Sequence, residues 1–229
     1  MNIALILSGG TGTRLDADIP KQYIEINGRM IISYCLETIL LHNQIDIVQI
    51  VADEKWHKEI MKYLSVADTN NKFKGFSMPG INRQLSILNG LEDISEYAKE
   101  SDVIFIHDGA RPFLSSDLIT ECLTEIKGHD GVLPVLPMKD TVYISRDGLK
   151  VNSLLNRNEI YSGQSPESFV LGKYLEANRR LLPDKILDIN GSTEPAIMAG
   201  MDIVMIKGDE NNFKITTKPD YDRFCSMVK

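Results

Sequence analysis

Short apolar runs alternate with longer amphipathic segments through the first half of the chain, and this pattern constrains the fold more than any other feature. Apolar runs of strand length occupy 3–7, 47–53 and 102–108, and segments with helical spacing of apolar residues occupy 31–42, 56–64 and 83–98. Strands that alternate with helices in this way form βαβ units, whose strands share one sheet. We therefore predict an α/β fold with a mostly parallel sheet flanked by helices.

The second half of the chain departs from this alternation. A helix is expected over 116–128, after a Ser cap and before Gly128. Residues 131–166 are interrupted by prolines and contain a possible hairpin turn at Arg146-Asp147-Gly148, so we predict an extended arm there. Helix and strand return at 171–182 and 202–208. A chain of 229 residues with 43% hydrophobic content fits a single domain over 1–229, with the arm at about 137–160.

Charge and cysteine usage exclude several classes of protein. The formal net charge of −7 argues against a protein that binds nucleic acid or a membrane surface, because such proteins normally present a basic face. The apolar run at 3–7 is too short for a membrane span or a signal peptide. The three cysteines lack the spacing of a zinc site or a redox motif and suggest inert thiols. We expect a cytoplasmic protein.

A glycine-rich loop follows the first apolar run and carries two cations. The stretch GGTGTRLDADIPKQ contains Arg14 and, seven positions later, Lys21. A loop after the first strand lies at the carboxyl edge of a parallel sheet, where backbone N–H groups can bind phosphate. A tight turn is the plain alternative, but an arginine fork and a lysine charge together suit the phosphates of a nucleotide.

Two known phosphate loops fit this stretch poorly. The Walker A pattern is absent, and GGTGTR falls short of the dinucleotide-binding fingerprint. That fingerprint also needs an acidic residue roughly 20 positions further on. The second apolar run ends at Asp53, about twice as far along the chain. A nicotinamide-dependent reductase is therefore a weak alternative.

Two further segments carry candidate site residues. In FIHDGARPF (105–113), Asp108 ends a buried run and is the best candidate ligand for the divalent cation that accompanies a nucleotide triphosphate, although such a carboxylate can also cap a turn. His107 is more simply explained by packing. Lys214, in NNFKITTKPD (211–220), gains weight only if it lies beside the other cations.

With these segments in hand, the chain resembles the methylerythritol-phosphate and ribitol-phosphate cytidylyltransferase family. The resemblance covers nearly the whole chain, and its motifs appear in this order: LSGGTGTRLDADIPKQY, PGINRQLSILNGL, IHDGARPF, PMKDTV, LNRNEIYSGQSPESF and NFKITT. It implies a Rossmann-like homodimer in which the arm of each subunit reaches over its partner. It also implies an enzyme that transfers CMP from CTP to a sugar-alcohol phosphate and releases pyrophosphate, with Mg²⁺ as cofactor.

The resemblance also implies residue roles. Arg14, Lys21 and Lys214 would be catalytic. Asp108 would bind the metal. The remaining nucleotide-binding residues would be Ser8, Gly9, Gly10, Thr11, Gly12, Gly80, Arg83, Ser86 and Gly109. The acceptor would contact Arg111 and Ser165, together with Thr141 and Arg157 on the arm of the neighbouring subunit. A non-catalytic nucleotide-binding module would not need Lys21, Asp108, Arg157 and Lys214 together.

The residues leave the acceptor open between 2-C-methyl-D-erythritol 4-phosphate and D-ribitol 5-phosphate. Family members usually carry an Asp in a run like TDEA, where this chain has Glu194 and Pro195 in NGSTEPA (190–196). The run GQSP (163–166) favours the pentitol branch, whereas the spacing of Arg14 and Lys21 also suits the methylerythritol branch. The first branch implies teichoic acid or capsule biosynthesis, and the second implies isoprenoid biosynthesis.

Overall fold

A central mixed sheet organises the chain. The computed structural model describes residues 1–10 and 19–228, and in this part of the chain eight strands join in the order β10-β7-β11-β6-β1-β4-β5, with β12 also paired to β7. The strands are β1 (Asn2–Leu7), β4 (Ile47–Val51), β5 (Phe73–Ser77), β6 (Val103–Asp108), β7 (Gly131–Pro137), β10 (Tyr161–Gly163), β11 (Glu167–Val170) and β12 (Ile203–Lys207). Pairing is parallel from β6 to β5 and between β7 and β12, and antiparallel where β10 and β11 join. The predicted mostly parallel α/β sheet is confirmed.

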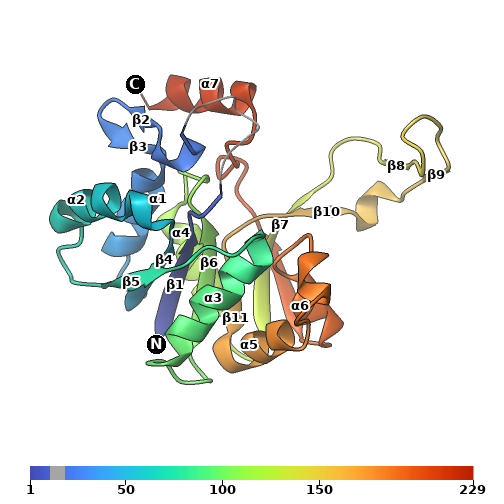
Figure 1. The fold of residues 1–229 in the computed structure, drawn as a ribbon. Coiled ribbons are helices and arrows are strands. Elements are labelled where there is room, and N and C mark those ends of the chain that lie inside the picture. Colours follow the sequence, from blue (N-terminus) through green and yellow to red (C-terminus); the bar gives the residue numbers. More distant parts are fainter. Residues whose placement is uncertain (11–18, 229) are drawn as a thin grey trace.

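Helices cover both faces of this sheet (Figure 1). They are α1 (Ile31–Leu41), α2 (His57–Ala67), α3 (Arg83–Ser95), α4 (Ser116–Glu125), α5 (Leu171–Arg179), α6 (Glu194–Met198) and α7 (Lys218–Met227). Single 3₁₀ turns lie at Lys21–Tyr23, Glu54–Trp56, Arg157–Glu159 and Lys185–Leu187, and a small hairpin is formed by β2 (Glu25–Ile26) and β3 (Arg29–Met30). None of the helices in the described residues has the length and apolar character needed to cross a membrane.

Successive side chains of β1 point to opposite faces of the sheet, and the apolar side chains on each face pack against helices. Ala4 and Ile6 belong to one core cluster with residues of α1, α2 and α4, whereas Ile3 and Leu5 belong to a second cluster with residues of α3 and α5. All four side chains are fully buried. A strand buried on both faces has a continuous apolar sequence, as IALIL does. Burial on both sides fixes the register of β1, because a slip by one residue would exchange its two faces.

The register of β1 against β6 creates the edge at which the candidate site lies. Leu7 at the end of β1 pairs with Asp108 at the end of β6. The loop that begins at Ser8 therefore starts beside Asp108, as expected for two parallel strands that end at the same edge. The third core cluster, Ile31 with Ile215 and Phe224, packs α7 near this end of the molecule.

Only the central part of the segment predicted as an arm projects from the sheet. The prediction of an arm over the whole of 131–166 is wrong at 131–137, because these residues form β7 inside the sheet, with Val132 and Val135 buried. A proline lacks the backbone N–H that a strand residue donates. The strand tolerates Pro134 because residues on either side of it pair with the neighbouring strands: Gly131 and Val132 with β11, and Val135 with β10. The chain leaves the sheet after Pro137 and returns at Tyr161, which pairs with Pro137, and Figure 1 shows the intervening segment projecting from the body.

The hairpin turn predicted within the arm is confirmed. Strands β8 (Tyr143–Ile144) and β9 (Ser153–Leu154) pair in antiparallel fashion around it. Gly148 has a φ of +72°, which a side chain would strain, and Asp147 Oδ1 accepts hydrogen bonds from the backbone N–H groups of Leu149 and Lys150, both at 2.9 Å. Local turn chemistry therefore forms this hairpin away from the core.

We expect Gly90→Ala to lower the free energy of unfolding by about 1–3 kcal/mol through overpacking. A Cβ at Gly90 would lie 2.5 Å from Leu5 Cδ1, and Leu5 is fully buried under α3. Chemical denaturation measures the change. Gly191→Ala is the control, because a Cβ there has no such neighbour within 4 Å. A Gly90→Ala protein as stable as wild type would show that α3 does not need this close approach.

Candidate nucleotide-binding site

The loop after β1 is held at its start by the segment that follows it. Gln22 Nε2 donates to the carbonyl oxygens of Ser8 and Gly10, both at 2.7 Å, and the Tyr23 hydroxyl donates to Ser8 O at 2.9 Å. Gly9 lies against Pro79, where a Cβ would approach to 2.6 Å. These contacts position the backbone of Gly9 and Gly10 at the sheet edge. Thr11, Gly12 and Arg14 lie outside the described residues.

A cavity of about 390 Å³ opens at this edge. Its described lining comes from the loop after β1, the 3₁₀ turn at Lys21, the start of α3, the end of β6 and the loop before α7. The lining residues are Leu7, Gly9, Gly10, Lys21, Gln22, Gly80, Ile81, Asn82, Arg83, Ser86, Asp108, Ala110 and Lys214. Lys21, Arg83 and Lys214 give the cavity a cationic lining, which suits an anionic ligand.

The first turn of α3 closes one wall of the cavity. Asn82 caps this helix, accepting a hydrogen bond from Leu85 N at 2.8 Å, and Ser86 Oγ accepts one from Gly80 N at 2.9 Å. A Cβ at Gly80 would lie 2.7 Å from the Leu85 carbonyl carbon, so only glycine fits this approach. The cap and the glycine together place Arg83 at the opening of the helix, facing the end of β6.

Asp108 is surrounded by three cations, two of them from distant parts of the chain and one, Arg111, from the turn that follows β6. Its Oδ1 accepts hydrogen bonds from Arg83 at 3.1 and 3.2 Å, and its Oδ2 lies 3.0 Å from Lys214 Nζ and 3.6 Å from Arg111 Nε. Burial alone would raise the pKa of Asp108, but the three positive charges outweigh burial and hold this pKa well below its usual value. Asp108 therefore stays ionised and gathers the cations at the cavity wall.

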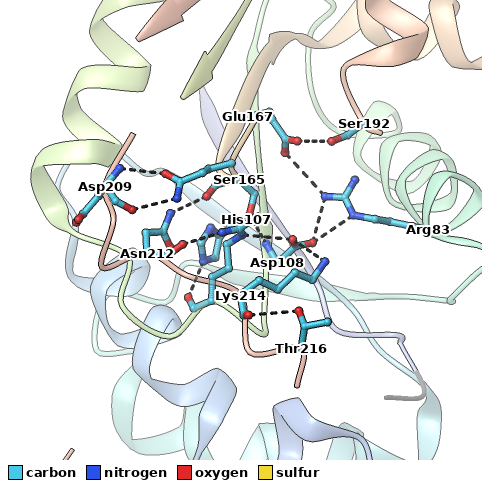
Figure 2. A network of polar contacts seen from close by, with 12 residues as sticks. Arg83, His107, Asp108, Ser165, Glu167, Ser192, Asp209, Asn212, Lys214 and Thr216 are labelled. Carbon is cyan, nitrogen blue, oxygen red and sulfur yellow. Dashed lines mark hydrogen bonds and ion pairs between the residues drawn. The ribbon is translucent and has the colours of Figure 1, made fainter. Parts of the chain in front are cut away.

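A polar network behind Asp108 fixes the loop that carries Lys214 (Figure 2). The backbone N–H of Asp108 donates to Ser165 Oγ at 3.1 Å, and Asn212 Nδ2 donates to Ser165 O at 2.7 Å. Gln164 exchanges two hydrogen bonds of 3.0 Å with the backbone of Asp209. Residues 164–165 therefore bind both the end of β6 and the loop after β12, which explains why Lys214 reaches Asp108.

Most of the sequence-predicted residues in the described part gather around this cavity. Gly9, Gly10, Lys21, Gly80, Arg83, Ser86, Asp108 and Lys214 line it. Arg111 pairs with Asp108 from behind and donates to Asn212 O at 2.7 Å. Ser8, Ser165 and Gly109 lie just outside the lining as supports, with Gly109 N donating to Leu7 O at 2.9 Å. The condition set for Lys214 is met, since Lys214 lies beside the other cations.

His107 is a packing residue, as expected from the sequence. It is fully buried, its Nε2 lies 3.0 Å from Arg111 O, and burial lowers its pKa to about 4. A neutral imidazole at the end of β6 thus supports the turn that presents Arg111. Its place next to Asp108 in the sequence does not make it part of the cavity lining.

The arm residues do not join the site within one chain. Thr141 and Arg157 lie on the projecting segment and are exposed, and Arg157 Nη1 donates to Lys139 O at 3.0 Å. Their assignment to a neighbour's acceptor site stays a prediction.

Sequence reasoning missed two residues that support the cavity. Gln22 anchors the glycine-rich loop, and Glu167 lies buried 3.9 Å from Arg83. Both stand inside motifs quoted for the resemblance, PKQY and SPESF, but a polar residue in a motif does not by itself indicate burial. Neither had a local signal of its own.

The described residues offer little protein ligation for a metal ion. No group of three or more His, Cys, Asp or Glu side chains among them lies close enough to hold one. Among the described lining residues, Asp108 alone has a carboxylate. One carboxylate is compatible with an Mg²⁺ ion held mostly by the phosphates of a nucleotide.

Comparison with known proteins agrees with this geometry. The family model of IspD, 2-C-methyl-D-erythritol 4-phosphate cytidylyltransferase, matches residues 2–227. The chain is 34% identical over 221 residues to the 2-C-methyl-D-erythritol 4-phosphate cytidylyltransferase of Clostridium tetani, covering 96% of this chain and 87% of that protein. It is 30% identical over 229 residues to the ribitol-5-phosphate cytidylyltransferase of Vibrio parahaemolyticus, covering 100% and 96%.

Solved structures share the fold. The crystal structure of 4-diphosphocytidyl-2C-methyl-D-erythritol synthase from Anaerococcus prevotii superposes with a TM-score of 0.84 at 23% identity, covering 99% of this chain and 95% of that one. Nothing in these comparisons supports the reductase or the non-catalytic nucleotide-binding module. The chain therefore belongs to the 2-C-methyl-D-erythritol 4-phosphate cytidylyltransferase family and is a nucleotidyltransferase.

Proposed function

We propose that the cavity binds CTP and that the enzyme transfers its cytidylyl group to a sugar-alcohol phosphate, releasing pyrophosphate. The observation that carries this proposal is the cationic cavity wall formed by Lys21, Arg83 and Lys214 opposite the backbone of Gly9 and Gly10. Backbone N–H groups and cations are the groups that bind phosphates. The family membership supports cytosine as the base.

The chemistry suits a site of cations without a nucleophile and base pair. An oxygen of the acceptor phosphate attacks the α-phosphorus of CTP, the bond from that phosphorus to the β-phosphate oxygen breaks, and pyrophosphate leaves. A phosphate is already ionised at neutral pH and needs no strong base. Positioning and charge neutralisation therefore account for catalysis, and Lys21 and Lys214 are the described side chains that we assign to neutralisation.

Asp108 has two roles in this proposal. It holds the side chains of Arg83, Arg111 and Lys214 in place. It would also be the protein ligand for an Mg²⁺ ion bound together with the triphosphate. A bound Mg²⁺ ion would neutralise phosphate charge. Every other contribution comes from the chain itself, which orients the nucleotide through α3 and the loop after β1.

The acceptor is either 2-C-methyl-D-erythritol 4-phosphate or D-ribitol 5-phosphate. Relatives named for each are similar to this chain over nearly their whole length. We propose the cytoplasm as the place of reaction, since the three cysteines are unpaired, as in a reducing compartment.

We further propose that the enzyme is a homodimer whose arms complete the acceptor sites. The segment beyond Pro137 exposes Tyr143, Leu149, Val151 and Leu154, with Leu149 at 89% exposure. Apolar side chains on a projecting hairpin favour a partner surface. The base of the arm also lies at the edge of the sheet that carries the site. Strand β11 is antiparallel to both β6 and β7, so β6 and β7 run in the same direction and end at the same edge.

Pyrophosphate release tests the reaction directly. Purified protein with CTP and Mg²⁺ should release pyrophosphate with one of the two acceptors at least tenfold faster than with the other, and at background rate with ATP or GTP in place of CTP. The acceptor panel contains 2-C-methyl-D-erythritol 4-phosphate, D-ribitol 5-phosphate and related alditol phosphates. The absence of release with every acceptor would refute the proposal.

Asp108→Asn should lower turnover by about a hundredfold or more and move the midpoint of the Mg²⁺ titration to higher concentration. The amide keeps the size of the side chain but loses the charge that holds three cations and the metal. Activity is measured across a Mg²⁺ series at saturating CTP. A lowered turnover with an unchanged midpoint would assign Asp108 to the cations alone, and unchanged turnover would make it structural.

Subunit mixing tests the arm. Lys21→Ala and Arg157→Ala should each be nearly inactive, and equal mixing with exchange should restore about a quarter of wild-type activity. Random pairing makes roughly half of the dimers mixed, and one of the two sites in each mixed dimer carries neither lesion. Native mass spectrometry confirms exchange. If exchange occurs without recovery, Arg157 acts in its own subunit or outside the site.

A further inference from the structure

Glu167 is a buried carboxylate that no motif assigned to the site. It begins β11 and pairs in register with Ile106, which lies two residues before Asp108 in β6. Its side chain has only 10% exposure. One carboxylate oxygen, Oε1, accepts a hydrogen bond from Ser192 Oγ, and the other, Oε2, is buried with no hydrogen-bond partner in the described structure.

The nearest cation to that second oxygen is Arg83. Glu167 Oε2 lies 3.9 Å from Arg83 Nη2, the same nitrogen that lies 3.1 Å from Asp108 Oδ1. Figure 2 shows the guanidinium between the two carboxylates. The hydrogen bonds to Asp108 come from Nε and Nη2, and the contact with Glu167 involves Nη2. Two acidic partners that share Nη2 restrict the orientation of the group more than one partner does, and Arg83 also lines the cavity.

Glu167 is itself fixed from behind by a buried chain of contacts that returns to α3. Ser192 O accepts a hydrogen bond from the Tyr174 hydroxyl at 2.6 Å, and that hydroxyl accepts one from Gln84 Nε2 at 3.2 Å. Gln84 follows Arg83 in the first turn of α3. The side chains of Gln84, Tyr174 and Ser192 are all buried. The carboxylate therefore has a fixed place relative to the helix from which Arg83 projects.

We propose that Glu167 is a positioning residue for nucleotide binding, which holds the Arg83 guanidinium in the orientation that meets the triphosphate or ribose of CTP. This inference rests on the proposed function of the cavity. Glu167 acts through Arg83 and does not touch the nucleotide. Its role is separate from that of Asp108, which gathers three cations.

The sign of the effect distinguishes positioning from simple charge. Glu167 is acidic, so removing its charge near an anion site would strengthen CTP binding if electrostatic repulsion were its main effect. Positioning has the opposite consequence, because Arg83 loses its second partner. We therefore expect Glu167→Gln to weaken CTP binding by about tenfold and to raise KM for CTP by a similar factor, with a smaller change in kcat.

A double-mutant cycle tests the route through Arg83. Calorimetry with CTP and Mg²⁺ gives Kd for wild type, Glu167→Gln, Arg83→Ala and the double variant. We expect Glu167→Gln to weaken binding about tenfold in the wild-type background and less than twofold in the Arg83→Ala background. If Arg83→Ala does not fold or binds CTP too weakly to measure, Arg83→Lys takes its place, because its ammonium lacks the fork that two carboxylates orient.

Glu92→Gln is the matched control. Glu92 also lies on α3 and forms a two-bond ion pair with Arg179 of α5, but this pair is exposed and outside the cavity lining. It should leave Kd and KM for CTP within twofold of wild type. Circular dichroism and thermal melting check that each variant folds.

The outcomes are distinct. Tighter or unchanged CTP binding by Glu167→Gln would overturn the positioning role. An equal loss of affinity with Arg83 present and with Arg83 replaced would overturn it as well. In either case, CTP binding and turnover by the wild-type protein would leave the proposed function intact. A wild-type protein that binds no CTP would overturn both. A loss of CTP affinity that occurs only when Arg83 is present supports the inference.

Discussion

The balance of charge around Asp108 is the interaction on which the site depends. A buried carboxylate is unfavourable unless cations and hydrogen bonds compensate it. Here the compensation of the carboxylate comes from Arg83, Arg111 and Lys214. The Ser165 hydroxyl accepts a hydrogen bond from the backbone N–H of Asp108 and so holds the end of β6 in place. The need to neutralise one carboxylate therefore brings the start of α3, the turn after β6 and the loop after β12 to one place.

Close backbone packing gives this charge cluster its shape. Gly9 lies against Pro79, and Gly80 lies against the first turn of α3, so neither position has room for a side chain. The Asn82 cap fixes where α3 begins. Because these contacts involve backbone, they hold the cavity wall independently of long side chains such as Lys21. A site built on strand ends and a helix start is held more firmly than one built on loops alone.

Residues 164–167 form the junction between this site and the rest of the molecule. They follow β10, which closes the base of the arm, and they run into β11, which pairs with β6. Gln164 and Ser165 bind the loop that carries Lys214, and Glu167 lies beside Arg83. The same four residues therefore adjoin the base of the arm and contact both the loop of the lysine and the arginine of the cavity. The arm and the nucleotide site are consequently connected by a short path of the same chain.

The sequence by itself determined the layered α/β fold, the glycine-rich loop at the edge of β1, the Asp at the end of β6 and the hairpin at Gly148. These features have local causes: burial on both faces leaves continuous apolar runs, and turns need particular residues. The sequence pattern predicted an arm at 131–137, where the structure has a strand, because prolines indicate an interrupted strand unless the pairings of the neighbouring residues are known. Tertiary structure alone decided that Lys214 reaches Asp108 and that Glu167 faces Arg83. Such contacts join residues separated by about a hundred positions, and a buried polar residue has the same local sequence as an exposed one until its neighbours are in place.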